Sequence, residues 1–164
     1  MARQDPHSYA DSDQPRARHL RLLLRVDFAA QRIEGEATLE LAAPAAGVLD
    51  LDSKGLEVLE VSTGAGSSVP FEVGPDEPIL GSRLRLTLPA GTREVRLRYR
   101  TSPDAPALQW LSPEQTEGGR HPFLFSQCQP IHARSLVPLQ DTARHRLTYE
   151  IGRASCRERV LPGV

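Results

Sequence analysis

Two glutamines that flank a cysteine are the residues of this chain with the clearest potential for ligand chemistry. Gln127, Cys128 and Gln129 lie in the segment FLFSQCQPIHARSLVPLQDT, which spans residues 123–142. The segment opens with three apolar residues of the kind that favour a β-strand. If that strand continues, Gln127 and Gln129 point to one side of it and Cys128 to the other. Each glutamine amide offers both donors and an acceptor, so the pair suits contact with a peptide backbone or an amine.

Three segments of the chain carry a resemblance to a known family. They are SQCQPIHARSLVPLQDT at residues 126–142, DPHSYA at residues 5–10 and VLDLDSKGLEV at residues 48–58. In this order they resemble the M1 zinc aminopeptidases, in particular the leukotriene A4 hydrolase-like branch, over the stretch from Asp5 to Tyr149. The resemblance implies a β-rich N-terminal domain that sits on a separate zinc-binding catalytic domain of the same polypeptide.

The resemblance also implies roles for five residues. Gln127, Cys128 and Gln129 would form a substrate-binding strip that holds the N-terminal residue of a peptide. Many relatives carry a glutamate where Gln129 stands, and there the carboxylate helps to bind the free amine. A neutral amide attracts an ammonium group less strongly. Arg134 and Asp141 would be structural residues, which lock the loop through an ion pair or backbone contacts, and no catalytic residue falls in this chain.

Zinc is implied for the parent enzyme, but the expected ligands are absent from this sequence. The catalytic domain of the family contains a His-Glu-x-x-His helix, whose two histidines lie on one face. The histidines of this chain show no such spacing; they are His7, His19, His121, His132 and His145. We therefore expect this chain to position a peptide substrate, while attack by a zinc-activated water belongs to the catalytic domain.

Two functions of other classes stay open at this point. A stand-alone β-sandwich that binds peptides or glycans without catalysis would explain an all-β pattern with no metal motif. A Cys128–His132 nucleophile pair is the other alternative, but catalytic pairs meet in space rather than in sequence, and no third orienting residue is evident. An inert and mostly buried thiol is the simpler interpretation of Cys128.

The elements that must position the glutamines are strands. Residues 20–28 and 33–41 alternate apolar and charged side chains, a pattern typical of an antiparallel sheet with one solvated face. Arginines dominate the outer face of the first strand and glutamates that of the second, so opposite charges would set their register. Further strands are expected at 48–52, 56–61, 69–73, 83–88, 94–99 and 146–151, with 89–92 as a connection. The sequence predicts an all-β fold: an antiparallel β-sandwich or a saddle-like curved sheet, truncated at its C-terminal side.

The chain has 164 residues, a length that fits one domain with two flanking segments. Residues 1–18 are polar, contain two prolines and predict an N-terminal arm that is ordered only if something docks on it. Residues 19–149 form the incomplete aminopeptidase-type β domain, in which 101–122 is a long irregular connection. Residues 150–164 contain EIGRASCRERV, which resembles the translation of a sequencing adapter and is expected to be a non-native tail.

Charge and hydropathy exclude several classes of partner. The net charge of −1 at pH 7 and the scattered arginines predict neither a nucleic-acid nor a membrane partner. No apolar run approaches the length of a membrane-spanning helix, and the N-terminus lacks the apolar region of a secretion signal. Two cysteines do not make a disulfide framework. We expect a cytoplasmic protein with reduced thiols, whose partners are a peptide substrate and its own catalytic domain.

Overall fold

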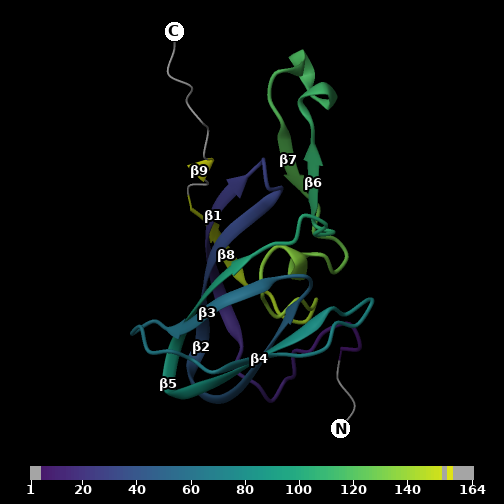
Figure 1. Ribbon diagram of the computed structural model, residues 1–164. Helices are drawn as coiled ribbons and strands as arrows, with labels where there is room; N and C mark the ends of the chain where they lie inside the picture. The colour runs from purple at the N-terminus through teal and green to yellow at the C-terminus, as the bar shows by residue number, and fades with distance from the viewer. Residues whose placement is uncertain (1–4, 153–154, 157–164) are drawn as a thin grey trace.

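The computed structural model describes residues 5–152 and 155–156, which form strands and loops with three short 3-10 turns (Figure 1). The strands are β1 (Ala17–Asp27), β2 (Arg32–Ser53), β3 (Glu57–Thr63), β4 (Phe71–Val73), β5 (Ser82–Arg100), β6 (Leu108–Leu111), β7 (Phe123–Ser126), β8 (Thr148–Ile151) and β9 (Ser155–Cys156). The turns are η1 (Pro113–Gln115), η2 (Glu117–Gly119) and η3 (Ala133–Ser135). Over this part of the chain, no helix is long and apolar enough to cross a membrane. The prediction of an all-β fold is confirmed.

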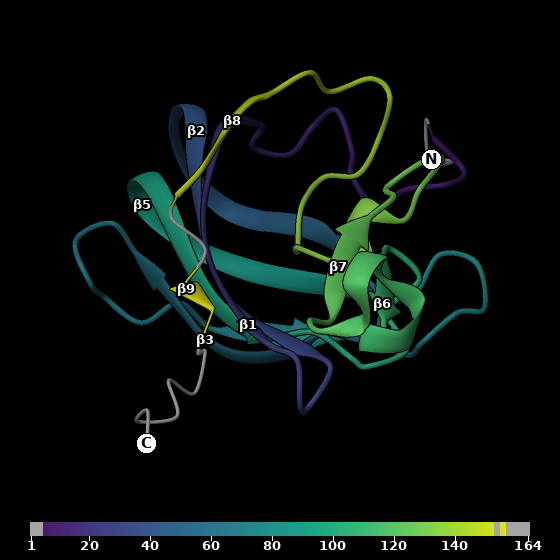
Figure 2. The same cartoon turned by 90° about the horizontal axis from the view of Figure 1, so that it is seen from above.

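Seven of the strands form one mixed sheet, and the other two form a separate hairpin. The order in the sheet is β3-β5-β2-β1-β8, with β4 also paired to β5 and β9 also paired to β1. The long strands pair antiparallel, whereas β8 and β9 run parallel to β1. Seen from above, the long strands bend round one side of the molecule (Figure 2). Of the two predicted architectures, the curved sheet is therefore the one that this chain adopts.

Strands β2 and β5 are each longer than the sequence pattern predicts. We expected the connection at 89–92 to separate two strands, but β5 continues through it, and β2 likewise continues through residues 42–47. The two strands pair on both sides of this region, with register shifts between Glu40 and Gly47. Gly47 and Gly91 have φ angles of 85° and 81°, which glycine adopts without strain. Small residues here bend a continuous ladder instead of reversing the chain, as β-bulges do.

The outer face of the sheet carries the predicted pairs of opposite charges. Arg25 lies directly across from Glu34, and their side chains form an ion pair of 3.3 Å. Arg21 contacts Glu40 of the same neighbouring strand at 3.2 Å. Each exposed pair contributes only about 0–1 kcal/mol, so the pairs help to select the register more than they stabilise the fold.

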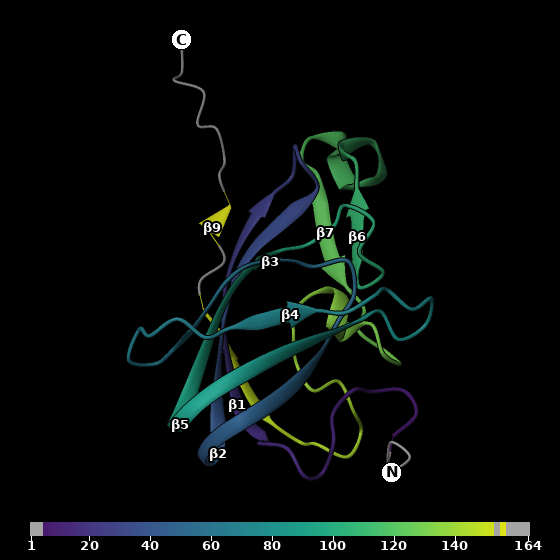
Figure 3. The same ribbon diagram turned by 60° about the horizontal axis from the view of Figure 1, so that its bottom comes forward.

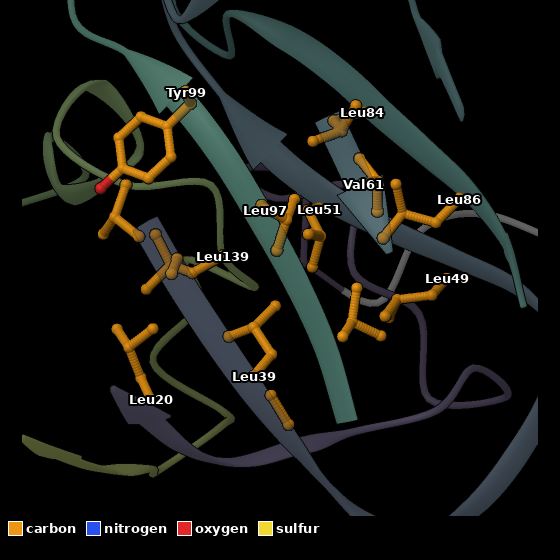
Figure 4. Packing of buried hydrophobic residues seen from close by; sticks show 14 of the residues in the cluster. Leu20, Leu39, Leu49, Leu51, Val61, Leu84, Leu86, Leu97, Tyr99 and Leu139 are labelled. Atoms are coloured by element: carbon orange, nitrogen blue, oxygen red, sulfur yellow. The ribbon is translucent and has the colours of Figure 1, made fainter. Parts of the chain in front are cut away.

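The hydrophobic core lies on the opposite, concave face (Figure 4). Its fully buried side chains come mainly from β2 and β5; they include Leu39, Leu49, Leu51, Leu84, Leu86, Val95, Leu97 and Tyr99. The segment after η3 covers this face, because Val137 and Leu139 belong to the same buried cluster and Leu147 packs against it. A loop segment of the same chain thus covers the core face of the sheet, where a sandwich would have a second sheet.

The hairpin of β6 and β7 stands beside the curved sheet, and the glutamines follow directly after it (Figure 1). The ring of Trp110 on β6 meets that of Phe28 edge to face, with the centroids 5.7 Å apart. A small second cluster, which also contains Ile33 and Leu108, joins the base of the hairpin to the β1–β2 connection. This contact fixes the position of the hairpin, and with it the point at which the residues after β7 begin.

The two ends of the chain also lie against the sheet. The N-terminal segment (residues 5–16) lies beside the yellow-green segment that follows β7 (Figure 3), and its residues 8–10 are buried. The described part of the predicted arm therefore packs against other segments of this chain, and its last two residues, Ala17 and Arg18, belong to β1. Of the expected non-native tail, residues 150–151 belong to β8 and 155–156 to β9. The greater part of 150–164 lies outside the described residues, and its origin stays a prediction.

Candidate substrate-binding loop

The loop that carries the two glutamines begins where β7 ends. We define the glutamine loop as residues 127–132. The strand stops at Ser126, so it does not continue through the glutamines as the alternation argument required. The amide of Gln127 donates to the carbonyl of Ala107 at 2.9 Å, and the chain then turns through a cis peptide bond between Gln129 and Pro130. Pro130 has no amide donor, so the chain cannot resume a full ladder with β6 at that residue.

Both glutamine side chains are exposed, and Cys128 between them is half-buried. No described residue hydrogen-bonds to either glutamine side chain. The amides therefore do not connect this loop to another part of the described chain. Each keeps its full set of donors and acceptors for a molecule outside the domain.

The thiol of Cys128 has the properties of an unreactive group. Burial raises the pKa of Cys128, and the negative charge of Asp141 raises it further. Little thiolate is then present at neutral pH, whereas the thiolate is the nucleophilic form. His132 contacts Cys128 through the backbone, with its amide donating to the Cys128 carbonyl at 2.9 Å. These features do not favour a cysteine nucleophile.

The glutamine loop is fastened at its first residue directly to buried Ala107 and at its last residue through Ser135 of η3. Ala107, which precedes β6, accepts a hydrogen bond from the amide of Gln127 and donates its own amide to the hydroxyl of Ser135 at 3.0 Å. Ser135 belongs to η3 and is fully buried. The same hydroxyl donates to the carbonyl of His132 at 2.8 Å. The base of the loop is therefore closed, while its glutamines project from it.

Directly beside Ser135, Arg134 is a fully buried arginine with partners on several segments. Its Nε donates to Asp141 at 3.1 Å. Its terminal nitrogens donate to the carbonyls of Leu80 at 2.9 Å and His7 at 2.7 Å, and to that of Asp141 at 3.1 Å. Charge-assisted bonds of this kind are stronger than neutral ones. Arg134 and Asp141, the two residues with predicted structural roles, are therefore in direct contact.

Asp52, at the end of β2, is the second buried charge of this site. It accepts hydrogen bonds from the Ser8 hydroxyl at 2.6 Å and from the amides of Tyr9 at 2.7 Å and Asp141 at 2.8 Å. Its carboxylate lies 3.7 Å from the guanidinium of Arg134. Burial raises the pKa of Asp52 against the opposing effect of these donors and the arginine. We call Ser8, Asp52, Arg134 and Asp141 the buried cluster.

Sequence reasoning missed Ser8 and Asp52. Both lie in the two earlier segments of the resemblance, 5–10 and 48–58, which we used only as landmarks. An aspartate that directly follows Leu51 in a predicted strand was the available signal, because an unpaired carboxylate is not tolerated in the core. The partner could not be inferred, since Ser8 and Arg134 are distant from Asp52 in sequence.

The described residues do not provide a site for zinc. Among residues 5–152 and 155–156, no group of three or more histidine, cysteine, aspartate or glutamate side chains could hold a metal ion. The donor set of the buried cluster is already occupied by an arginine and by hydrogen bonds. The described part of the chain therefore does not fit the zinc implied by the resemblance, and we assign no step of a reaction to the metal here.

A surface hollow of about 540 Å³ lies elsewhere, lined by residues 63–65, 67, 89–94 and 96. Two of its charged groups are already paired with each other, since Arg96 contacts Glu94 at 2.9 Å, and Glu94 also contacts Arg21 at 2.8 Å. Residues 127–132 do not line it. The size of this hollow therefore does not make it a better candidate than the exposed amides.

Comparison with known proteins shows the family of this chain. The model of the peptidase M1 N-terminal domain family matches residues 14–155. The chain belongs to this family. The resemblance inferred from the three segments is thereby confirmed, and the curved sheet with its hairpin is the M1 N-terminal domain as this sequence forms it.

The relatives of this M1 domain include aminopeptidases and leukotriene A4 hydrolases. A leucine aminopeptidase 2 of Yarrowia lipolytica is 36% identical over 90% of this chain and 23% of its own length. A leukotriene A-4 hydrolase of Xenopus laevis is 37% identical over 88% of this chain and 25% of its own length. The chain thus spans about a quarter of the length of these curated relatives.

Solved structures agree with this assignment. Leukotriene A4 hydrolase from yeast, in complex with bestatin, superposes with a TM-score of 0.81 at 33% identity, over 90% of this chain and 24% of that one. An M1 zinc metallopeptidase from Deinococcus radiodurans has a TM-score of 0.62 at 22% identity, over 84% of this chain and 32% of that one. The second comparison shows a shared fold only.

Proposed function

We propose that this chain is the N-terminal, substrate-positioning domain of a longer zinc aminopeptidase, in which Gln127 and Gln129 contact the N-terminal residue of a peptide. The observation that carries the proposal is the pair of exposed amides, with no partner among the described residues, on a loop whose base is fastened to a buried residue. Membership of the M1 family supports it. Zinc would be held by polypeptide outside this chain, and a cytoplasmic location stays a prediction.

The physical reason for this role is the combination of a fixed base with free amides. A binding loop that is ordered before the ligand arrives loses less conformational entropy on binding, and the affinity is higher by that amount. The fastening of Gln127 and Ser135 to Ala107 supplies that order without occupying the side chains. A peptide N-terminus offers an ammonium donor and a carbonyl acceptor, which match the two kinds of atom in a carboxamide.

The test uses the full-length enzyme with Gln127→Ala and Gln129→Ala, assayed on aminoacyl-p-nitroanilides. Each change should raise KM about two- to tenfold, the factor that corresponds to one neutral hydrogen bond of about 0.5–1.5 kcal/mol. Gln109→Ala is the matched control, because Gln109 is an exposed glutamine on β6 of the same hairpin. Equal effects of the control and the two variants would refute the assignment.

A second variant tests which group of the substrate is bound. Gln129→Glu replaces the neutral amide with a carboxylate, which attracts an ammonium group more strongly. KM should fall at pH 7 and the advantage should fade as the substrate amine loses its proton, near a pKa of about 8 for an α-amino group. An unchanged KM at every pH would mean that Gln129 does not face the amine.

A further inference from the structure

We propose that the buried cluster of Ser8, Asp52, Arg134 and Asp141 is a positioning device, through which the N-terminal segment sets the place of the glutamine loop. The inference rests on the proposed function of that loop and extends it to residues that do not touch the peptide. It assigns a functional role to Ser8, at the far end of the chain from the glutamines.

The glutamine loop is held by few backbone contacts. Within the described chain its backbone hydrogen bonds lead to Ala107 at one end and to η3 at the other. The side chains of Gln127 and Gln129 add no bonds to described residues. The orientation of the loop therefore depends on η3, which contains Arg134 and Ser135.

Arg134 supplies most of the polar contacts that join η3 to distant segments, alongside the bond of Ser135 to Ala107 and the packing of Ala133 against the core. Its carbonyl accepts a hydrogen bond from the amide of Lys54 at 2.9 Å, and its amide donates to the Asp141 carboxylate at 3.3 Å. Its guanidinium is bonded to three separate segments, as described above. A buried guanidinium tolerates few alternative positions, because each displaced bond leaves a buried polar group unpaired.

The N-terminal segment completes the cluster. The carbonyl of His7 accepts from Arg134, and Ser8 and Tyr9 supply two of the three hydrogen bonds to Asp52. Asp52 in turn accepts the amide of Asp141, the ion-pair partner of Arg134. Removing the Ser8 hydroxyl would leave the buried carboxylate under-satisfied, and the arginine is the group within reach that could move to compensate. That movement would shift η3 and with it the glutamine loop.

The first arm of the experiment measures the loop without any assay of activity. Hydrogen exchange of the amides of His132 and Ser135, which donate to Cys128 and His132, is compared in the intact protein and in Ser8→Ala. We expect about tenfold faster exchange in the variant, which corresponds to about 1.4 kcal/mol. Ser8→Thr keeps a hydroxyl and should restore protection. Ser68→Ala, an exposed serine in the turn before β4, is the control.

The second arm measures substrate binding in the full-length enzyme. Ser8→Ala should raise KM by a similar factor of about ten with a smaller change in kcat. In a background that already contains Gln127→Ala and Gln129→Ala, the same change should have no further effect on KM. A general loss of stability would instead add to the effect of the glutamine variants. Asp5→Asn, which weakens the more exposed contact with Thr142, is the milder substitute if Ser8→Ala does not fold.

The outcomes separate this inference from the function on which it rests. If the glutamine variants raise KM but Ser8→Ala changes neither exchange nor KM, the positioning role is refuted and the proposed function stands. If the effects of Ser8 and the glutamines add, the cluster is merely structural and the inference is equally refuted. If the glutamine variants have no effect, the proposed function fails, and the exchange data alone decide whether the cluster holds the loop.

Discussion

Gly35 and Tyr99 form a cross-strand pair, and we predict that Gly35→Ala lowers the free energy of unfolding. Gly35 on β2 lies directly opposite Tyr99 on β5. A methyl group added at Gly35 would come within 2.3 Å of the Tyr99 ring, a distance that no real side chain adopts. Tyr99 is fully buried in the core (Figure 4), so its ring could move away only by displacing other core side chains or toward the neighbouring surface hollow.

Two effects of Gly35→Ala oppose each other. Alanine in a strand is favoured over glycine by about 0.5–1 kcal/mol, because glycine loses more conformational freedom on folding. Overpacking of a well-filled core costs about 1–3 kcal/mol. Because the clash involves two ring carbons and the hydroxyl oxygen of a fully buried tyrosine, we expect the upper part of that range and a net destabilisation of about 1–2 kcal/mol.

A double-mutant cycle with Tyr99→Val isolates the clash. In the Tyr99→Val background the ring is gone, so Gly35→Ala should become neutral or stabilise the protein by about 0.5–1 kcal/mol. Urea unfolding can be followed by far-ultraviolet circular dichroism and by the fluorescence of Trp110, the single tryptophan. Coincident transitions establish that one free energy of unfolding applies. If Gly35→Ala stabilises the parent chain, the proposed packing of the ring over Gly35 is wrong.

Three further predictions concern charged and ionisable groups. Arg134→Met should lower the free energy of unfolding by about 3–5 kcal/mol, because it leaves buried Asp52 without its cation; a loss below about 1 kcal/mol in urea would contradict the buried ion pair. Cys128, studied in a Cys156→Ser background, should react slowly with iodoacetamide at pH 7. The pH at which its alkylation rate is half-maximal should lie above 9.0, because its pKa is raised; a half-maximal rate below pH 8 would count against its burial. Asp50 has a lowered pKa: burial opposes the shift, but the hydrogen bonds from Arg85 at 2.7 and 2.8 Å and from Gln14 outweigh it. The contribution of Asp50 to stability is therefore present above its unfolded pKa of 3.8 and is lost as the pH falls through its folded pKa. The difference in the free energy of unfolding between the parent chain and Asp50→Asn should narrow from pH 6 to pH 3. A difference that stays constant over this range would refute the prediction.

Much of the sheet could be predicted because its signals are local. The alternation in residues 20–28 and 33–41 indicates one apolar and one charged face whatever the partners are, and β1 and β2 follow it closely. The bends near Gly47 and Gly91 could not be predicted, because the same small residues serve a reversing turn and a bulge. Only the long-range pairing of β2 with β5 decides between the two.

The site divides in the same way. The glutamine segment stood out by composition, and its resemblance to a family located the loop. The contacts that hold the loop could not be predicted, because they join residues far apart in sequence: Ser8 to Asp52, and His7 to Arg134. Neither charge patterning nor periodicity reports such contacts. A buried aspartate signals that partners exist but leaves their identity to the tertiary structure.

The closure of Ala107 onto Gln127 has a consequence for how this domain can vary. One backbone hydrogen bond, between Ala107 and Gln127, closes the hairpin segment 108–126 at its base. Changes in the length of its tip therefore do not alter the base. Insertions or deletions around η1 and η2 would therefore leave Gln127 and Gln129 at the same position relative to the curved sheet. The hairpin tip is accordingly the place where related sequences, or a protein engineer, can add or remove residues with the least disturbance to substrate contact.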